Sequence, residues 1–456
     1  MDQVDLSIIS KYDVSGPRYT SYPTALQFAE LDDDQYIQAI HDSPRKDKDI
    51  SLYFHIPFCD TLCYYCACNK IITRDKSKAE DYLRLLYREI ELKAEHLAGR
   101  SVSQLHWGGG TPTFLSDLQI QALMDKNREH FQLWSDEDGE FSIEIDPRTV
   151  DEARIQALRK AGFNRLSMGI QDFNPVVQKA VNRIQSFEAT ESVIKAARGC
   201  GFRSISVDLI YGLPHQTVES VRNTLDQIIE LSPDRISIYN YAHLPDRFTP
   251  QKRIKLVDLP SADNKLRILK LCIEKLTGEA GYCYIGMDHF AKPEDELAVA
   301  QSQGTLHRNF QGYSTFSDRD LIAFGVTAIS LVGNTYAQNT KQMDEYERRI
   351  NSGQLPVEKG VVIDQDDLIR KAVIMALICH FEIEFADIEA EFGINFTNYF
   401  AEELEQLEQF AGDGLLILKE DSIQVTDKGR LLIRNICMCF DRHLKQVSGQ
   451  RFSKAI

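Results

Sequence analysis

Between residues 50 and 241 the chain repeats one hydrophobic pattern, in which a short run of strand-forming residues is followed by a loop with glycine or proline and then by an amphipathic stretch. This alternation is typical of successive βα units. Six runs fit strands: residues 50–54 (ISLYF), 103–107 (SQLHW), 141–145 (FSIEI), 165–170 (RLSMGI), 204–210 (SISVDLI) and 235–241 (RISIYNY).

The amphipathic stretches have the spacing of helices. Between the first two predicted strands, apolar residues recur at intervals of 4, 4 and 7, which places them on one helical face. Six consecutive βα units require a parallel sheet covered by helices, so we predict an α/β fold, either doubly wound or curved into a partial (β/α)6 barrel. Ligands bind such folds beyond the C-terminal ends of the strands. The first helical stretch contains Tyr82, Leu86, Ile90 and Leu97, and later stretches contain Leu158, Ile194 and Leu225.

The remainder of the chain has a different pattern. Residues 246–263 lack periodicity and contain two prolines, which indicates a connection before a helix at residues 266–276. Residues 364–444 have helical periodicity at 366–379, 385–392 and 396–410, followed by a hairpin at 415–425 and a last helix. We therefore predict an N-terminal arm (1–40), an α/β domain (41–330) and a small, mainly helical C-terminal domain of winged-helix type (362–456).

Composition limits what the surface can bind. With 456 residues, 43% of them hydrophobic, the chain can bury sizeable cores in two to four domains. Its 52 Lys and Arg against 68 Asp and Glu give a formal charge of -16, which argues against a general nucleic-acid or anionic-membrane surface. The predicted winged helix does not change this view, because residues 364–445 hold 17 acidic and 8 basic residues, and contact with phosphates needs the opposite sign.

Neither a membrane span nor an export signal is predicted. The longest uninterrupted apolar run, residues 372–379, has 8 residues, and a membrane helix needs about 18. The first ten residues, MDQVDLSIIS, contain neither a basic nor an apolar segment, so we predict a cytoplasmic protein. In that reducing compartment the ten cysteines are not expected to form disulfides.

Four of the ten cysteines lie within ten residues, directly after the first predicted strand. Cys59, Cys63 and Cys66 form a C-x3-C-x2-C motif, and Cys68 follows after one further residue. A zinc site would need a second pair of ligands elsewhere, and none stands out in the sequence. Ferredoxin clusters use four cysteines, but wrapping one cubane with both Cys66 and Cys68 is geometrically awkward. Three thiolates would leave one iron of a 4Fe-4S cluster open to a small ligand, with Cys68 available for another task.

The cysteine motif resembles that of the radical S-adenosylmethionine (SAM) superfamily, in which an aromatic residue, here Tyr65, precedes the third cysteine. The resemblance implies that the open iron binds the amino and carboxylate groups of SAM. It further implies that one electron from the cluster cleaves SAM to a 5'-deoxyadenosyl radical. A structural zinc or redox loop is the alternative interpretation.

Two further features fall at predicted strand ends. Residues 108–112 (GGGTP) follow the second strand, and glycines let a ligand approach the backbone closely. No Lys-Ser or Lys-Thr follows, which excludes a phosphate-binding loop, although a tight turn alone would use the same glycines. Glu144, Gln171 and Asp208 lie at or near the ends of the next three strands. Single residues there could be capped or solvated, but three in register favour hydrogen bonds to a ribose, amine or carboxylate.

Seven longer segments resemble the oxygen-independent coproporphyrinogen III oxidase (dehydrogenase) family of haem biosynthesis. The similarity extends over nearly the whole chain and identifies residues 41–330 as a radical SAM catalytic domain. The segments are RYTSYPTA (18–25), HIPFC through CACN (55–69), GGGTPT (108–113), EIDPR (144–148), MGIQDF (168–173), DLIYGLPHQT (208–217) and HRNFQGYST (307–315).

The resemblance also implies roles for individual residues. The cluster ligands would be Cys59, Cys63 and Cys66. The cluster-bound SAM would be held by Tyr53, Gly109, Glu144 and Ile329, and a second SAM by Tyr65, Gly110, Thr111, Gln171, Arg183, Asp208 and Ala242. Tyr53, His55 and Cys68 would be needed for turnover beyond cluster assembly, although a lone His beside a strand end can also be simply hydrogen-bonded.

The implied reaction converts two propionates of coproporphyrinogen III to vinyl groups and gives protoporphyrinogen IX. Each conversion removes one β-hydrogen, one electron and carbon dioxide, so two SAM molecules are expected per substrate. The implied partners are this substrate and a one-electron reductant of flavodoxin or ferredoxin type, and we expect a monomer without nucleic-acid or membrane partners. Arg18 and Arg308 are candidate cations for the anionic propionates, although either could be a surface charge.

A haem chaperone that shares the radical SAM core is the alternative function. Such relatives generally lack the RYTSYPTA arm and have another residue at the position of Cys68. Both features are present here, which favours the enzyme. An electron-carrying iron-sulfur protein would need neither the glycine motif nor the polar strand ends.

Overall fold

The structure is a computed structural model that describes residues 6–12, 14–97, 99–316 and 318–444. Residues 1–5 of the predicted arm and 445–456 of the predicted C-terminal domain lie outside these ranges. The six predicted strands are present and neighbour one another in a parallel array, which a seventh strand, β15 (Asp320–Phe324), extends at one side. They are β2 (Ile50–Ile56), β5 (Ser101–Gly109), β7 (Glu140–Ile145), β8 (Arg165–Gln171), β9 (Ser204–Tyr211) and β10 (Arg235–Asn240).

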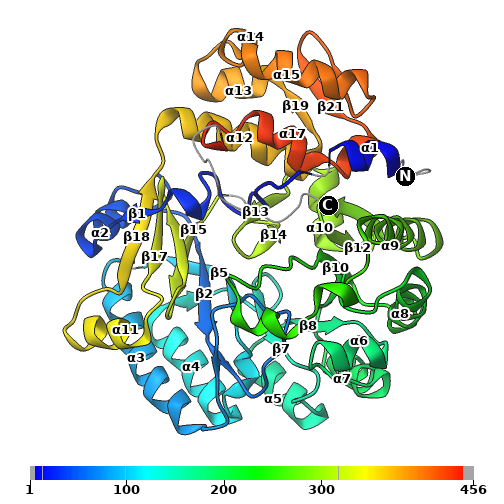
Figure 1. Cartoon of the computed structure of the whole chain (residues 1–456). Coiled ribbons are helices and arrows are strands. Elements are labelled where there is room, and N and C mark those ends of the chain that lie inside the picture. Colours follow the sequence, from blue (N-terminus) through cyan, green and yellow to red (C-terminus); the bar gives the residue numbers. More distant parts are fainter. Residues whose placement is uncertain (1–5, 13, 98, 317, 445–456) are drawn as a thin grey trace.

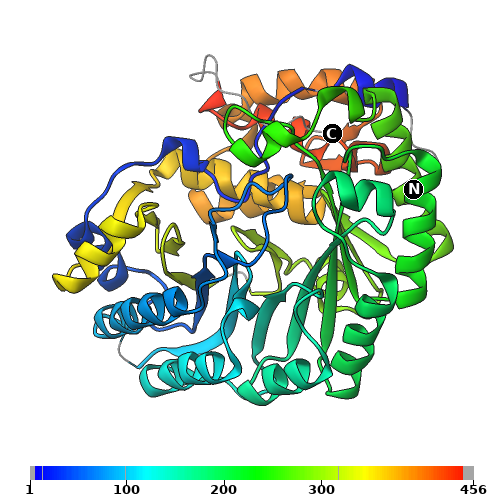
Figure 2. The same cartoon turned by 60° about the horizontal axis from the view of Figure 1, so that its bottom comes forward.

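The helices between these strands lie along the outer side of a curved sheet (Figure 1, Figure 2). This arrangement matches the curved alternative predicted from the sequence rather than the doubly wound one. The first helix ends at Ala94, so the predicted helical face stops short of Leu97, which is buried beyond the helix. The helices are α3 (Ser77–Ala94), α4 (Asp117–His130), α5 (Glu152–Ala161), α6 (Pro175–Ala180), α7 (Phe187–Gly199), α8 (Val218–Leu231) and α9 (Ala262–Glu274).

Antiparallel strands that the sequence pattern did not predict extend both edges of the sheet. β10 is followed in the sheet by β12 (His289–Ala291) and β11 (Cys283–Gly286). On the other side, β15 is followed by β16 (Ile329–Val332), β17 (Thr335–Asn339), β18 (Val357–Val362) and β1 (Ala29–Glu30). Helices α2 (Asp33–His41), α10 (Glu296–Ser302) and α11 (Met343–Asn351), the short β6 (Gln132–Leu133) beside β5, and the hairpin β13 (His307–Asn309) with β14 (Gly312–Ser314) complete this part.

A buried ion pair fixes α3 against the sheet. Glu89 and Lys93 have no exposed side-chain surface, and their charged atoms are 2.7 Å apart. Lys93 also donates to the carbonyl of Ala323, and Glu89 accepts from the amide of Gly325 and the hydroxyl of Tyr346. Each charge therefore has several partners, which is the condition under which a buried pair is tolerated.

The C-terminal domain is mainly helical, as predicted. It begins with α12 (Gln365–His380) and carries a three-stranded sheet in the order β19, β21, β20. The predicted helix at 396–410 is divided at Phe400, which separates α14 from α15. The elements are β19 (Glu382–Glu384), α13 (Phe385–Phe392), α14 (Phe396–Tyr399), α15 (Ala401–Gly412), β20 (Leu416–Leu418), β21 (Ser422–Val425), α16 (Asp427–Arg430) and α17 (Ile433–Cys439).

Tyr12 and residues 14–22 connect this domain to the rest of the chain, and we call their contacts with residues 410–443 the clasp. The Tyr12 ring stacks on Phe410 with centroids 4.8 Å apart, and the Tyr19 hydroxyl donates to Asp441 over 3.0 Å. Arg434 donates to the carbonyl of Pro17 at 2.9 Å. Arg18 turns the other way and forms an ion pair with Asp288, so this candidate substrate cation already has a carboxylate partner.

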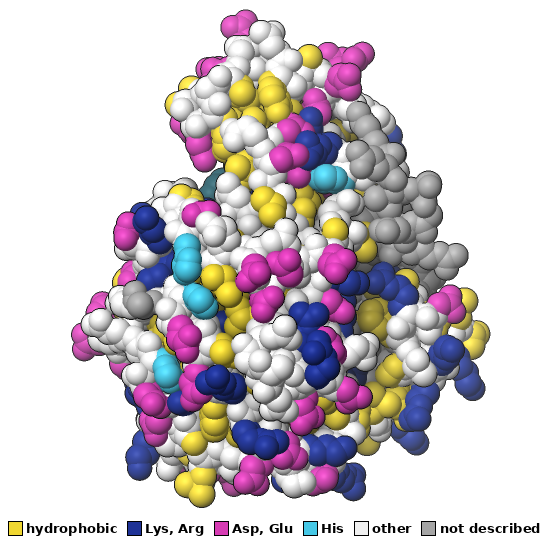
Figure 3. Space-filling view, turned by 90° about the vertical axis from the view of Figure 1, so that its left-hand side faces the viewer, with side chains coloured by type: hydrophobic (Ala, Val, Ile, Leu, Met, Phe, Trp, Pro, Cys, Tyr) yellow, Lys and Arg dark blue, Asp and Glu magenta, His cyan; other side chains and the backbone are white. Residues whose placement is uncertain are grey.

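The outer surface has mixed charge. Figure 3 shows the side that carries α2, β18 and α11, with the C-terminal domain as a lobe above the body and acidic and basic side chains interspersed over both. None of the helices described is long and apolar enough to cross a membrane.

Candidate active site

The cysteine loop leaves the sheet at the C-terminal end of β2. Two short parallel strands, β3 (Phe58–Cys59) and β4 (Ile71–Ile72), close the loop at its base. Cys59, Cys63 and Cys66 then line one cavity of about 440 Å³. The sequence motif therefore brings its three thiols to one space at the expected edge of the sheet.

Basic side chains surround these thiols. The guanidinium groups of Arg183 and Arg148 lie 3.7 and 3.8 Å from the Cys63 sulfur, and both also pair with Asp146. Thr111 donates to the Cys59 sulfur over 3.6 Å, whereas burial raises the pKa of that thiol to about 11. Arg148 and Asp146 were not predicted as site residues, although both belong to the EIDPR segment.

Cys68 occupies a position different from that of the other three cysteines. Its thiol interacts with Cys66, which raises the pKa of Cys68 and lowers that of Cys66; the charge of Lys70 also lowers the pKa of Cys66. The Cys68 side chain is exposed, and it lines two cavities, so the accessible surface of Cys68 faces the interior of the site. It is therefore not a packed core residue.

The donor set fits an iron-sulfur cluster better than a single ion. Among the residues that the structure describes, no three His, Cys, Asp or Glu side chains are grouped closely enough to ligate one metal ion. The three thiols of the motif instead surround a space, and thiolate sulfur is the ligand that iron-sulfur clusters use. Arg148, Arg183 and Lys70 supply positive charge near these sulfurs.

The glycine turn after β5 adjoins the cysteine loop. Gly109 has φ 110°, a conformation that side chains rarely adopt. A Cβ on Gly110 would lie 2.7 Å from the carbonyl oxygen of Phe58 and 2.8 Å from that of Pro57. Thr111 donates its amide to Phe58 over 2.8 Å, so the turn and the loop hold each other in place.

The polar strand ends converge on the same cavity. Glu144 from β7, Gln171 from β8 and Asp208 from β9 line it together with Tyr65, Arg183 and the glycine turn. Burial opposes ionisation of Glu144, but His106 (3.2 Å) and the amide of Gly109 (3.2 Å) donate to it and leave its pKa below the ordinary value. Burial and the nearby charge of Glu144 raise the pKa of Asp208 to about 7. At neutral pH, Glu144 is therefore ionised, whereas Asp208 is divided between its protonated and ionised forms.

Replacement of Asp208 by Asn is expected to stabilise the metal-free protein above neutral pH. The unfolded Asp ionises near pH 4, whereas the folded one resists ionisation up to about pH 7. The wild type must therefore lose stability relative to the variant as pH rises between these values, by up to a few kcal/mol. Urea unfolding of both proteins at pH 4.5 and pH 8 checks this. An equal difference at the two pH values would contradict the raised pKa.

A second cavity, of about 330 Å³, contains the other predicted residues. Tyr53, His55, Cys68 and Ile329 line it, and it shares Cys68, Gly109 and Glu144 with the first. The His55 Nε2 atom lies 3.0 Å from the carbonyl of Asn69, which can only accept, so Nε2 carries the proton. The Nδ1 atom then accepts from the Tyr53 hydroxyl at 3.2 Å, and burial lowers the pKa of the ring. His55 is thus a neutral ring with both nitrogens occupied.

The two cavities separate the predicted residues only partly in the way that the two SAM assignments do. Six of the seven residues assigned to a second SAM line the cavity with the thiols, whereas Tyr53 and Ile329 line only the other cavity. Ala242 follows β10 and lines neither of these cavities. The six are Tyr65, Gly110, Thr111, Gln171, Arg183 and Asp208.

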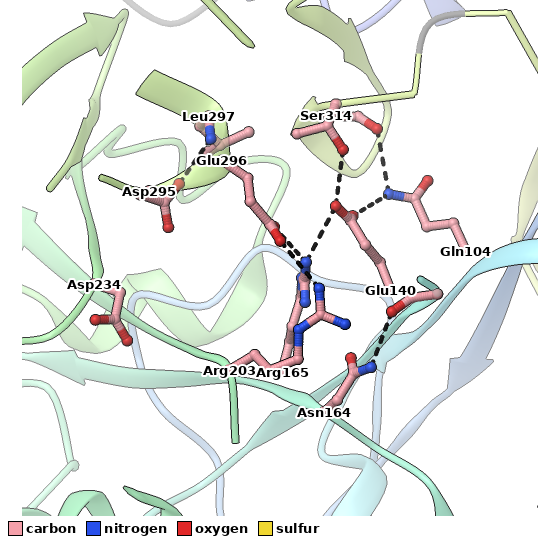
Figure 4. Close-up of polar contacts among 12 residues, drawn as sticks. Gln104, Glu140, Asn164, Arg165, Arg203, Asp234, Asp295, Glu296, Leu297 and Ser314 are labelled. Carbon is pink, nitrogen blue, oxygen red and sulfur yellow. Dashed lines mark hydrogen bonds and ion pairs between the residues drawn. The ribbon is translucent and has the colours of Figure 1, made fainter. Parts of the chain in front are cut away.

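A polar network closes the curved sheet beneath the site. A third cavity, of about 170 Å³, is bordered by Glu144 and Asp208 on one side and by Glu140 and Arg165 on the other. Arg165 bridges Glu140 (3.3 Å) and Glu296, which also pairs with Arg203 at 3.2 Å (Figure 4). Barrel interiors are usually filled with branched apolar side chains, so this floor is unusually polar.

Replacement of Arg165 by Met is expected to destabilise the fold strongly. The change leaves the buried Glu140 without its closest cation, which typically costs about 3–5 kcal/mol. Urea unfolding measures the loss. The control is Arg267→Met, which breaks an exposed pair with Asp263 and should cost less than about 1 kcal/mol. An equal decrease in the free energy of unfolding in the two variants would show that the network around Arg165 does not stabilise the fold.

Comparisons with known proteins agree with this architecture. The Radical SAM superfamily model matches residues 53–228, and that of the HemN C-terminal domain matches residues 363–432. The chain is 53% identical over 454 residues to the oxygen-independent coproporphyrinogen III oxidase of Pseudomonas aeruginosa, covering 99% of this chain and 98% of that protein. It is 52% identical over 454 residues to the Escherichia coli oxidase of the same name, with the same coverage.

One solved structure extends this similarity to three dimensions. It is that of coproporphyrinogen III oxidase (HemN) from Escherichia coli, described as a radical SAM enzyme. It superposes with a TM-score of 0.92 at 51% identity and covers 97% of this chain and 99% of that chain. The predicted fold class is thereby confirmed, and the chain belongs to the oxygen-independent coproporphyrinogen III oxidase family of the radical SAM superfamily.

Proposed function

We propose that this protein converts coproporphyrinogen III to protoporphyrinogen IX by oxidative decarboxylation of two propionates in haem biosynthesis. The observation that carries the proposal is one shared cavity, in which the C-x3-C-x2-C thiols, the glycine turn and the strand-end carboxyl groups meet. This arrangement occurs in a chain that is 53% identical over 454 residues to a curated oxidase of this kind.

The radical SAM family implies a 4Fe-4S cluster and SAM. We assign the cluster to Cys59, Cys63 and Cys66. We assign one SAM to Tyr53, Gly109, Glu144 and Ile329, and a second to Tyr65, Gly110, Thr111, Gln171, Arg183, Asp208 and Ala242. When bound, these groups supply an electron and a 5'-deoxyadenosyl radical that removes a hydrogen atom from the propionate.

The chain's own residues orient and shield this chemistry. Glu144 is held ionised by His106 and the Gly109 amide, so it can accept a hydrogen bond from an amine or hydroxyl. Asp208 can donate a proton or accept one near neutral pH. Tyr65 and Arg183 form part of the wall of the space beside the thiols.

The second cavity supplies the residues that we propose act during turnover. Cys68 lies between the two cavities, and Tyr53 holds His55 by a hydrogen bond. These three side chains border the space where a propionate can approach. We further propose a flavodoxin or ferredoxin as the electron donor and a monomer located in the cytoplasm.

The test is turnover under strictly anaerobic conditions. Reconstituted protein, SAM, dithionite and coproporphyrinogen III should give protoporphyrinogen IX with two 5'-deoxyadenosine and two carbon dioxide molecules per product. One 5'-deoxyadenosine per product would contradict the use of two SAM molecules. Tight haem binding without product would support the chaperone function instead.

A further inference from the structure

Helix α12 meets the hairpin β13–β14 (Figure 1). Lys371 on α12 forms no ion pair with any of the residues that the structure describes, and its amine lies 5.1 Å from the ring centroid of Tyr336. His307 on β13 is a near neighbour. The chain has a net charge of -16, so a basic side chain without a carboxylate partner is unusual in it. Such a buried basic group is stabilised when an external anion binds to it.

The titratable groups that act on Lys371 and on His307 are all basic. Burial and, to a smaller extent, the charge of Arg45 lower the pKa of Lys371 to about 7. Burial likewise lowers the pKa of His307 to about 4, with contributions from Lys371, Arg45 and His380. No carboxylate is among the groups that act on either side chain. Arg45 itself pairs with Asp318 and Asp320, so Lys371 is the group here that an arriving carboxylate could pair with.

An aromatic wall connects Lys371 to the candidate active site. Tyr336 contacts Phe310 edge to face with ring centroids 5.7 Å apart, and it stacks on Phe28 at 5.9 Å. Phe310 lines the 330 Å³ cavity together with Tyr53 and Cys68. The same apolar cluster includes Tyr53, Ile329 and, on α12, Leu368. Apolar side chains thus pack continuously from Phe310 at the second cavity, through the buried Tyr336, to the amine of Lys371.

The other predicted cation, Arg308, lies on the opposite face of the hairpin from Lys371. It is 5% exposed, and its guanidinium lies 4.7 Å from the ring centroid of Tyr313, its partner across the hairpin. Two of its nitrogens, Nε and Nη1, are buried and have no hydrogen-bond partner in the described structure. His307 and Arg308 are successive residues of one strand, so their side chains point to opposite faces, and Lys371 lies on the His307 side.

We propose that Lys371 binds a carboxylate of the substrate, namely a propionate on a ring that does not react, while the apolar body of the tetrapyrrole lies against Phe310 at the second cavity. This inference rests on the proposed function. A tetrapyrrole with propionates combines an apolar face with carboxylates at its edge, and the wall and the amine match these two properties. The C-terminal domain would then take part in substrate binding through α12.

The test compares Lys371→Met with Lys371→Arg in the anaerobic holoenzyme. Lys371→Met keeps the apolar stem and should raise the KM for coproporphyrinogen III by about 10-fold to 100-fold, the usual effect of losing a hydrogen bond to a charged group. Iron content, SAM binding and kcat should stay near wild type. Lys371→Arg should restore the KM to within about threefold, because a guanidinium keeps the positive charge and also pairs with a carboxylate. The matched control is Lys419→Met, an exposed lysine of the same domain, which should leave the KM unchanged.

A substrate analogue whose two non-reacting propionates are methyl esters allows a double-mutant-type cycle, in which the change in the protein and the change in the substrate are made separately and together. The wild type should have a raised KM for this analogue, and Lys371→Met should add no further loss, because the partner of the amine is already gone. A wild-type KM in Lys371→Met, or full additivity of the variant and the esters, overturns the inference while the proposed function stands. If the wild type itself makes no protoporphyrinogen although its cluster and SAM cleavage are intact, the proposed function fails, and the inference fails with it.

Discussion

Replacing Cys63 with Ser is expected to remove the iron-sulfur cluster and all protoporphyrinogen formation. Cys63 is buried, lines the cavity with Cys59 and Cys66, and has two guanidinium groups beside its sulfur. Serine oxygen is a poor substitute for a thiolate toward iron, so iron and sulfide content should fall to background. The visible absorbance of the anaerobic protein and its iron and sulfide content measure the effect.

The control for this experiment is Cys200→Ser. Cys200 is half-buried at the C-terminal end of α7 and borders a different surface depression, away from the thiol cavity. Full iron and sulfide should remain in that variant. Full iron and sulfide in Cys63→Ser would instead exclude Cys63 as a ligand and redirect the assignment to Cys68.

Cys68→Ser is expected to keep the cluster and to lower product yield at least 100-fold. The Cys68 thiol interacts with Cys66, yet its exposed surface faces both cavities, which is where a group that handles a proton or electron should lie. A loss of this size is typical of removing a positioned proton-transfer group. Metal content and single-turnover yield are to be measured on the same anaerobic sample.

Two other outcomes are distinguishable for Cys68. Loss of iron would make it a cluster ligand after all. An intact cluster with normal yield would leave it without a role in turnover. Simple core packing, a common role for a free cysteine, is disfavoured already because this side chain is exposed within the site.

Local pattern predicted the parallel strands and the residues at their ends. Glu144, Gln171 and Asp208 come together because parallel strands bring their carboxyl ends to one edge, a rule that needs no knowledge of side-chain contacts. Cys59, Cys63 and Cys66 were placed by spacing and by the same rule. The site could therefore be located from the sequence before its geometry was known.

Long-range pairing accounts for what the sequence did not predict. The antiparallel strands β16, β17 and β18 are short, and their partners are set by tertiary contacts rather than by their own composition. Glu89 and Lys93 have the spacing of an exposed helical pair, yet both are buried against Ala323 and Gly325. Lys371 similarly has the sequence context of an ordinary helical lysine, and only the fold reveals that none of the described residues gives it a carboxylate partner.

The clasp has a consequence for how the protein is made. Tyr12 and Tyr19 are separated from their partners Asp413 and Asp441 by 401 and 422 residues, so these contacts cannot form until almost the whole chain has been synthesised. The six predicted parallel strands and the cysteine loop are complete by residue 240, well before the partners of the clasp leave the ribosome. The central sheet can thus fold during translation, whereas the N-terminal arm can form its contacts only after the C-terminal domain has been synthesised. Contacts that close last are absent from the folding transition state, so a weakened clasp should shorten the lifetime of the folded enzyme without slowing its folding.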